Sequence, residues 1–135
     1  MTVVVDASTI IAALIDSGSD GVWAEQFLAT SDIAAPHLMP VEVTNILRRS
    51  AIKGSITADV ASLALNDLND LSVEYFEFRP FASRIWELRQ NVTAYDAWYV
   101  ALAETLSAPV ATLDDRLRQA VGPRCAYLTP TSNPG

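Results

Sequence analysis

The chain is poor in the residues that most often carry catalysis or covalent cross-links. Among its 135 residues there is one cysteine, one histidine and one lysine. A lone cysteine cannot form an internal disulfide, so Cys125 gives no reason to expect an oxidising compartment and is predicted to be a small buried or half-buried side chain. The lone histidine, His37, is predicted to lie in a surface turn. Glycine-rich loops of the P-loop or dinucleotide-binding kind are also absent.

Positive charge is scarce as well. Nine Lys and Arg residues stand against 16 Asp and Glu residues, which gives a formal net charge of −7. This excess of negative charge argues against a protein that holds nucleic acid through a broad basic surface. A phosphate ligand would therefore need a local source of positive charge, either bound cations or short groups of basic residues. The simpler explanation of each basic group is a solvated helix face. The basic groups in question are Arg48, Arg49 and Lys53, and Arg116 with Arg118.

No apolar run is as long as a membrane span, and the amino terminus lacks the charged opening and long apolar stretch of a signal peptide. The hydrophobic share of 50% and the charged share of 19% are typical of globular proteins. We therefore expect no association with a membrane and a location in the cytoplasm. The length fits one domain, which we predict for residues 1–128, with a loose tail over residues 129–135.

Strand-like and helix-like segments alternate along the chain. Short apolar or alternating runs predict strands over residues 2–5, 32–36, 71–76, 108–113 and 126–128. Apolar residues at helical spacing predict helices over 7–15, 20–30, from 38 onward, around 61–68, and over 81–88, 93–103 and 115–120. This alternation predicts an α/β fold with a mainly parallel sheet covered on both faces. In such sheets, functional groups gather beyond the carboxyl ends of the strands.

Four acidic residues lie where an unpaired carboxylate is costly, next to apolar strands or within apolar helices. Asp6 directly follows the first predicted strand, and Asp114 follows the strand predicted for 108–113. Glu42 borders the apolar stripe of the third helix, and Asp96 opens a helix that is apolar nearly all round. If both helices begin at the carboxyl edge of the sheet, the four carboxylates converge there.

Each acid also has an ordinary structural explanation, and these alternatives stay open. Asp6 and Asp114 can cap the helices that follow them. A Glu in the first turn, as expected for Glu42, is favoured by the helix dipole in any protein. The spacing from Thr93 to Asp96 resembles a capping box. Asp96 remains the least ordinary of the four, because the residues three, four and seven positions further on are all of the kind found in a core.

A convergent set of carboxylates predicts a metal site. Like charges a few ångströms apart raise one another's pKa, and a hard divalent cation that prefers oxygen ligands relieves the repulsion. Magnesium or manganese is the natural choice. One or two such ions can orient a water molecule, lower its pKa and stabilise the charge that builds up on a phosphodiester, without a nucleophile from the protein.

Four short segments carry a resemblance to a known family. The segments 6–8 (Asp-Ala-Ser), 40–43 (Pro-Val-Glu-Val), 95–97 (Tyr-Asp-Ala) and 112–114 (Thr-Leu-Asp) resemble, in order and approximate spacing, the four acidic motifs of the PIN-domain nucleases. The pattern is most similar to the VapC-type ribonuclease toxins of bacterial toxin–antitoxin pairs. Each motif alone is short and common, but together they extend from the first predicted strand almost to the last.

The resemblance implies a PIN-like fold, a three-layer α/β/α sandwich with a mainly parallel central sheet. It also implies magnesium-dependent endonucleolytic cleavage of RNA, with manganese as an alternative ion. Two protein partners are implied: a second copy of the chain in a homodimer, and a small cognate antitoxin of the VapB kind whose C-terminal segment lies across the site.

The resemblance further implies a role for each acid. Asp6 and Asp96 correspond to the principal metal ligands, Asp114 completes the shell, and Glu42 holds a metal-bound water.

Two hydroxyl residues, Ser8 and Thr112, resemble the accessory hydroxyls of the family. One departure concerns Leu113, because many relatives carry a polar residue, often Asn, before the last Asp. This departure leaves the ligand role of Asp114 open. Asp115 is expected to be a solvated residue of the first helical turn, and whether it takes the place of Asp114 is also open.

Three other readings compete with a PIN nuclease. A haloacid-dehalogenase phosphotransferase would need a second Asp two residues after Asp6, where the chain has Ser8. A receiver domain would need a lysine at a late strand end, whereas Lys53 lies in a helical region. A PIN-like interaction module that binds a partner without cutting RNA is the stronger rival, and the presence of all four acids counts against it.

Two aromatic residues flank Asp96 in the sequence, Tyr95 and Trp98. Either could stack on a nucleic-acid base. Because the helix that carries them is apolar nearly all round, packing in the core is the expected role of both.

Overall fold

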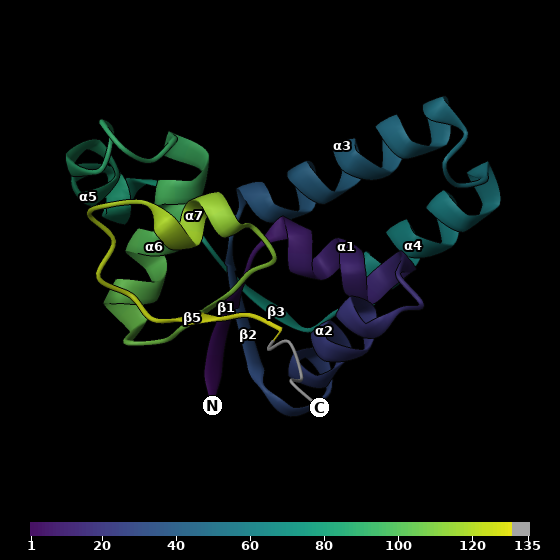
Figure 1. Cartoon of the computed structure of the whole chain (residues 1–135), viewed down its shortest axis with the longest axis horizontal. Coiled ribbons are helices and arrows are strands. Elements are labelled where there is room, and N and C mark those ends of the chain that lie inside the picture. Colours follow the sequence, from purple (N-terminus) through teal and green to yellow (C-terminus); the bar gives the residue numbers. More distant parts are fainter. Residues whose placement is uncertain (131–135) are drawn as a thin grey trace.

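A parallel sheet forms the centre of the computed structural model, which describes residues 1–130 (Figure 1). Its strands are β1 (Thr2–Val5), β2 (Asp32–Pro36), β3 (Val73–Phe76), β4 (Val110–Ala111) and β5 (Tyr127–Leu128). They lie in the order β3-β2-β1-β4-β5, and every neighbouring pair is parallel. Because all of these strands run the same way, their carboxyl ends meet at one edge of the sheet.

Helices cover both sides of the sheet. They are α1 (Ala7–Ile15), α2 (Ser19–Thr30), α3 (Leu38–Lys53), α4 (Ala58–Asp70), the 3-10 helix η1 (Arg79–Phe81), α5 (Ala82–Glu87), α6 (Ala94–Leu106) and α7 (Asp115–Gln119). In Figure 1 the helices α1 to α4 lie to the right of the sheet and α5, α6 and α7 to its left. The predicted three-layer α/β/α sandwich is therefore confirmed, and the sheet is parallel throughout its five strands.

The core extends over both faces of the sheet and includes the central strand β1 and the helix α6. Val3, Val4 and Val5 have no exposed surface, as expected for a central strand that is covered on both faces. Val100 and Leu102 of α6 are equally buried, and the helix packs against β1 and β2. The prediction that this helix is buried is therefore right.

Two predicted elements are shorter or more divided than expected. The strand predicted for 108–113 is reduced to β4, because Pro109 has no N–H to donate to the sheet and the chain turns away after Ala111. The helix predicted for 81–88 is divided into η1 and α5, with Pro80 in the first turn. His37 lies exposed at the start of α3, and Cys125 is half-buried, both as predicted.

The tail predicted for 129–135 falls largely outside the described residues. Within residues 1–130, no helix is both long enough and apolar enough to cross a membrane.

Helices α1 and α2 pack closely against each other at Gly21. A Cβ atom added at Gly21 would lie 1.8 Å from the backbone oxygen of Asp16 and 2.9 Å from that of Ala12. Neither oxygen can move without disturbing the end of α1. The hairpin of α1 and α2 thus depends on the missing side chain, and α1 is the helix that begins at Asp6.

We predict that Gly21→Ala lowers the free energy of unfolding by about 1–3 kcal/mol or more, because the helices must separate to admit the methyl group. Chemical denaturation followed by circular dichroism measures the loss. Gly18→Ala is the matched control, since its Cβ would approach only the flexible carboxylate of Asp16, at 3.0 Å. Equal unfolding midpoints for the two variants would contradict the prediction.

Candidate active site

Asp6 lies at the carboxyl end of the central strand and is 7% exposed. Its Oδ1 accepts hydrogen bonds from the backbone N–H of Thr9, at 3.0 Å, and from the hydroxyl of Ser8, at 2.7 Å. Its Oδ2 accepts a hydrogen bond from the hydroxyl of Thr112. Burial raises the pKa of Asp6, and these hydrogen bonds oppose the rise. The capping interpretation of Asp6 is therefore right, but it does not account for the burial or for the contact with Thr112.

Two hydroxyl groups join the end of β1 to the end of β4. The hydroxyl of Thr112, which donates to Asp6, accepts from the backbone N–H of Asp114 at 2.9 Å. The hydroxyl of Ser8, which also donates to Asp6, accepts from the backbone N–H of Leu113 at 3.1 Å. Each hydroxyl is thus both donor and acceptor, and its proton is directed at the carboxylate. These contacts give Ser8 and Thr112 a supporting position around Asp6.

Asp114 caps the short helix α7. Its Oδ1 accepts from the backbone N–H groups of Arg116, at 2.9 Å, and of Leu117, at 3.4 Å. Asp115 is exposed and pairs with Arg118 at 2.5 Å. The predicted solvated position of Asp115 is therefore correct, and its carboxylate is engaged on the outside of the helix.

Glu42 lies in the second turn of α3, which begins at Leu38 as predicted. The alternative explanation, that Glu42 is a first-turn residue favoured by the helix dipole, therefore does not hold. Its Oε1 accepts a hydrogen bond of 2.7 Å from the hydroxyl of Tyr99 on α6. Burial raises the pKa of Glu42, and the charges of Asp96 and Asp6 raise it further, against the effect of Tyr99.

Sequence reasoning did not find Tyr99. Its ring is 2% exposed, and burial raises the pKa of its hydroxyl far above the usual range, so the group stays protonated and donates to Glu42. A signal was present, because Tyr99 lies three residues after Asp96 on the same helical face. A buried tyrosine also usually finds a hydrogen-bond partner for its hydroxyl.

Asp96 lies in the first turn of α6, where its backbone N–H donates to the hydroxyl of Thr93 at 3.2 Å. Burial raises the pKa of Asp96, and the charges of Asp114 and Asp6 raise it further, while Thr93 and Arg116 lower it. Asp96 and Asp114 line one cavity of about 240 Å³. The capping interpretation thus explains the hydrogen bond of the Asp96 backbone N–H to Thr93. It does not explain why the carboxylate of Asp96 lies near other acids.

The four predicted acids are therefore neighbours at the carboxyl edge of the sheet. The charge of Asp6 acts on both Glu42 and Asp96, and the charge of Asp114 acts on Asp96. Within residues 1–130, however, no three His, Cys, Asp or Glu side chains are arranged so that they could already hold a metal ion. Hydrogen bonds direct both oxygens of Asp6 and one oxygen of Asp114 elsewhere.

The donor chemistry nevertheless fits a hard divalent cation. All four groups offer carboxylate oxygens, which magnesium and manganese prefer. Three of the four carboxyl groups, those of Asp6, Glu42 and Asp96, have raised pKa values because they are partly or fully withdrawn from water. A positive charge placed among them would favour their ionised forms.

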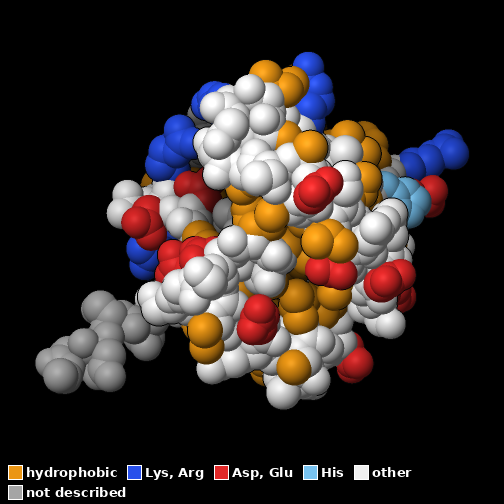
Figure 2. All heavy atoms as spheres, turned by 90° about the vertical axis from the view of Figure 1, so that its right-hand side faces the viewer, with side chains coloured by type: hydrophobic (Ala, Val, Ile, Leu, Met, Phe, Trp, Pro, Cys, Tyr) orange, Lys and Arg blue, Asp and Glu red, His pale blue; other side chains and the backbone are white. Residues whose placement is uncertain are grey.

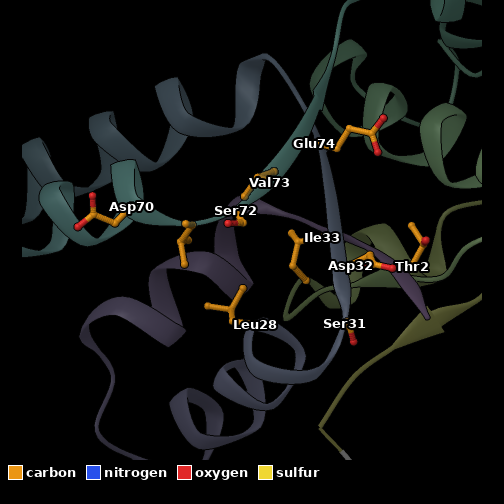
Figure 3. Close-up of a pocket in the computed structure, with 10 residues that line it drawn as sticks. Thr2, Leu28, Ser31, Asp32, Ile33, Asp70, Ser72, Val73 and Glu74 are labelled. Atoms are coloured by element: carbon orange, nitrogen blue, oxygen red, sulfur yellow. The ribbon is translucent and has the colours of Figure 1, made fainter.

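A larger cavity lies away from these acids. It has a volume of about 640 Å³ and is lined from the amino ends of β1 and β2, from β3 and from the end of α4 (Figure 3). Three acids line it as well, Asp32, Asp70 and Glu74.

The aromatic residues beside Asp96 differ in their surroundings. Tyr95 is 61% exposed, so the expectation that it packs in the core was wrong. Trp98 is half-buried, and its ring meets the edge of Phe78 with a centroid distance of 5.5 Å.

Comparison with known proteins identifies the family of this chain. The family description "PIN domain" matches residues 3–122. Ribonuclease VapC1 of Mycobacterium tuberculosis (strain ATCC 25618 / H37Rv) is 39% identical over 123 residues, which are 90% of this chain and 92% of that protein. Ribonuclease VapC9 of the same strain is 38% identical, with 91% and 94% covered. The chain belongs to the PIN-domain family, in its group of VapC ribonucleases.

Solved structures show the same fold at lower identity. The crystal structure of PAE2754 from Pyrobaculum aerophilum has a TM-score of 0.69 and 23% identity, with 94% of this chain and 83% of that chain covered. The crystal structure of VapBC2 from Rickettsia felis, bound to a DNA fragment from their promoter, has a TM-score of 0.70 and 13% identity, with 96% and 98% covered.

The raised pKa values predict a particular dependence of stability on pH. A carboxyl group whose pKa is higher in the folded chain stabilises the fold below its unfolded pKa, and this contribution is lost as the pH rises through the folded pKa. With a chelator present, we therefore expect Asp96→Asn to raise the melting temperature at pH 7 and to flatten the gain in stability on mild acidification. Asp115→Asn, at an exposed position, is the control, and an unaltered pH profile for Asp96→Asn would count against the electrostatic coupling.

Proposed function

We propose that the protein is a metal-dependent endoribonuclease that acts as the toxin of a toxin–antitoxin pair and hydrolyses RNA phosphodiesters at the site of Asp6, Glu42, Asp96 and Asp114. The observation that supports this most is the gathering of acids from four separate elements at one sheet edge. Asp96 and Asp114 line one cavity, and the hydroxyl of Thr112 lies between the carboxylate of Asp6 and the backbone N–H of Asp114. Tyr99, on the same helix as Asp96, donates to Glu42. The names of the relatives, which are ribonucleases, support the type of reaction.

Asp6, Asp96 and Asp114 would hold the cation, which we take to be Mg²⁺, with Mn²⁺ as the alternative. A carboxylate offers about four lone pairs, of which Asp6 uses three for hydrogen bonds. The hydrogen bonds of Asp114 fall on Oδ1, so its Oδ2 is the oxygen suited to a cation. Such a cation, when bound, lowers the pKa of a water molecule and offsets the charge that develops on the phosphodiester.

The residues around the acids orient them. Ser8 and Thr112 direct their protons at Asp6, and these hydrogen bonds oppose the rise in the pKa of Asp6 that burial causes. Tyr99 holds one oxygen of Glu42, which leaves the other oxygen free to position or deprotonate the attacking water. A raised pKa suits Glu42 to accept a proton, because proton transfer is most efficient when the pKa of the base is close to the working pH.

Membership of the VapC group also supports a proposal about protein partners. Solved structures of the same fold include toxin–antitoxin complexes named VapBC and FitAB. We propose a cognate VapB-type antitoxin, a homodimer of this chain and action in the cytoplasm. A PIN-like interaction module without nuclease activity is the alternative, and the retention of all four acids favours the nuclease.

Asp6→Asn and Asp96→Asn should each reduce metal-dependent cleavage of RNA by about 100-fold or more, since even residues that only support metal ligands cost 10–100-fold when changed. Cleavage of total cellular RNA in Mg²⁺ or Mn²⁺ is measured on gels, and sequencing of the fragments identifies the cut sites. Asp67→Asn, at an exposed position on α4, serves as the control. Unchanged cleavage by either site variant would remove that residue from the proposed mechanism.

Mg²⁺ or Mn²⁺ should raise the melting temperature of the wild-type chain with increasing concentration, because a ligand of the folded state opposes unfolding by mass action. At 100 times the dissociation constant the gain is about 2.7 kcal/mol. Asp96→Asn should shift the titration to higher metal concentrations. A flat titration of the wild-type chain at millimolar metal would favour the interaction module instead.

A further inference from the structure

Three aromatic side chains gather at the start of α6. Tyr95 is 61% exposed and Phe78, which follows β3, is 47% exposed. Trp98 is half-buried and meets Phe78 edge to face, with an angle of 88° between the rings. Tyr95 and Trp98 are three residues apart on one helix and therefore share a face. We call Phe78, Tyr95 and Trp98 the aromatic patch.

The aromatic patch lies beside the proposed active site. Tyr95 directly precedes Asp96 in the first turn of α6. Trp98 directly precedes Tyr99, whose hydroxyl donates to Glu42. Because these pairs are adjacent in one helix, the patch and the acids are separated by no more than about one helical turn.

Phe78 comes from the same edge of the sheet. It lies two residues beyond the end of β3 at Phe76, and the backbone oxygen of Phe76 accepts from the N–H of His37, at the end of β2, at 2.9 Å. The patch is thus built from the carboxyl ends of the strands and the start of a helix, as the acid cluster is.

Packing alone leaves the patch incompletely explained. Tyr95 and Phe78 expose large apolar surfaces that the fold has not covered. The indole N–H of Trp98 is buried and has no hydrogen-bond acceptor among the described residues.

The net negative charge of the protein limits how much electrostatic attraction can contribute to binding of a nucleic acid. With a net charge of −7, the surface repels a nucleic-acid backbone over most of its area. Figure 2 shows Asp and Glu spread over one face, with Lys and Arg at its margins. Stacking of bases on aromatic rings needs no positive charge, and RNA is commonly recognised by stacking its unpaired bases on such rings.

We infer that the aromatic patch stacks an unpaired RNA base next to the phosphodiester that is cut. This inference rests on the proposed ribonuclease function and adds to it the residues that hold a base of the substrate. Tyr95, which directly precedes Asp96, provides one exposed ring for stacking. Phe78, which is exposed and in contact with Trp98, provides a second.

The test measures binding of a short single-stranded RNA to the full chain in Mg²⁺, in an Asp6→Asn background that prevents cleavage. Tyr95→Ala and Phe78→Ala should each weaken binding by about 5- to 150-fold, the range that follows from loss of one stacked base. Tyr95→Phe keeps the ring and should keep the affinity. Trp86→Ala is the matched control, because Trp86 is an exposed aromatic on α5 outside the patch.

An RNA that lacks the base on one side of the cut should bind the wild-type chain and the Tyr95→Ala chain equally. This result would show that the ring of Tyr95 contacts that base. If Tyr95 had only a structural role, removal of the base would not abolish the difference between the two chains. Circular dichroism checks that each variant is folded.

The outcomes separate this inference from the proposed function. Absence of metal-dependent RNA cleavage by the wild-type chain would overturn both. Cleavage by the wild-type chain together with unchanged RNA affinity of Tyr95→Ala and Phe78→Ala would overturn the stacking inference alone. A change of oligomeric state in these variants, with RNA affinity unchanged, would likewise overturn it and assign the patch to contacts between protein chains.

Discussion

The buried carboxylate of Asp6 is the group on which the geometry of the site depends. It lies at the end of the central strand, where its desolvation is costly, and it is held there by the hydroxyls of Ser8 and Thr112 and by the N–H of Thr9. Because Thr112 follows β4, these bonds fix the ends of two neighbouring strands relative to each other. The start of α1 and the turn before α7 are thereby positioned by the same carboxylate.

The other acids are placed at an energetic disadvantage around it. Glu42 and Asp96 lie on two helices, and neither carboxylate is needed to cap its helix. Burial and the charges of neighbouring acids raise the pKa of both groups. Such mutual repulsion lowers the stability of the fold, a common cost of function in proteins. Tyr99 shows how the fold limits this cost, since its buried hydroxyl holds Glu42 in one orientation. Repulsion and orientation together are what a site for a divalent cation needs before the cation arrives.

The aromatic patch complements the acids in chemical character. A strongly negative surface can attract a phosphodiester only where cations are held, so additional affinity must come from contacts that do not involve charge. Phe78, Tyr95 and Trp98 offer such contacts within a short distance of Asp96. Acids for the phosphate and rings for the base would divide recognition of one nucleotide between two adjoining surfaces.

The sequence by itself determined the fold class and the four acids, because strand and helix periodicity and carboxylates beside apolar runs are local properties. It also indicated the caps at Asp6 and Asp114. Only the tertiary structure decided that Tyr99 would meet Glu42, that Thr112 would donate to Asp6 and that Tyr95 would be exposed. The two hydrogen bonds connect residues that are 57 and 106 positions apart in the chain. Such contacts depend on how strands are ordered and helices are rotated, which local patterns do not specify.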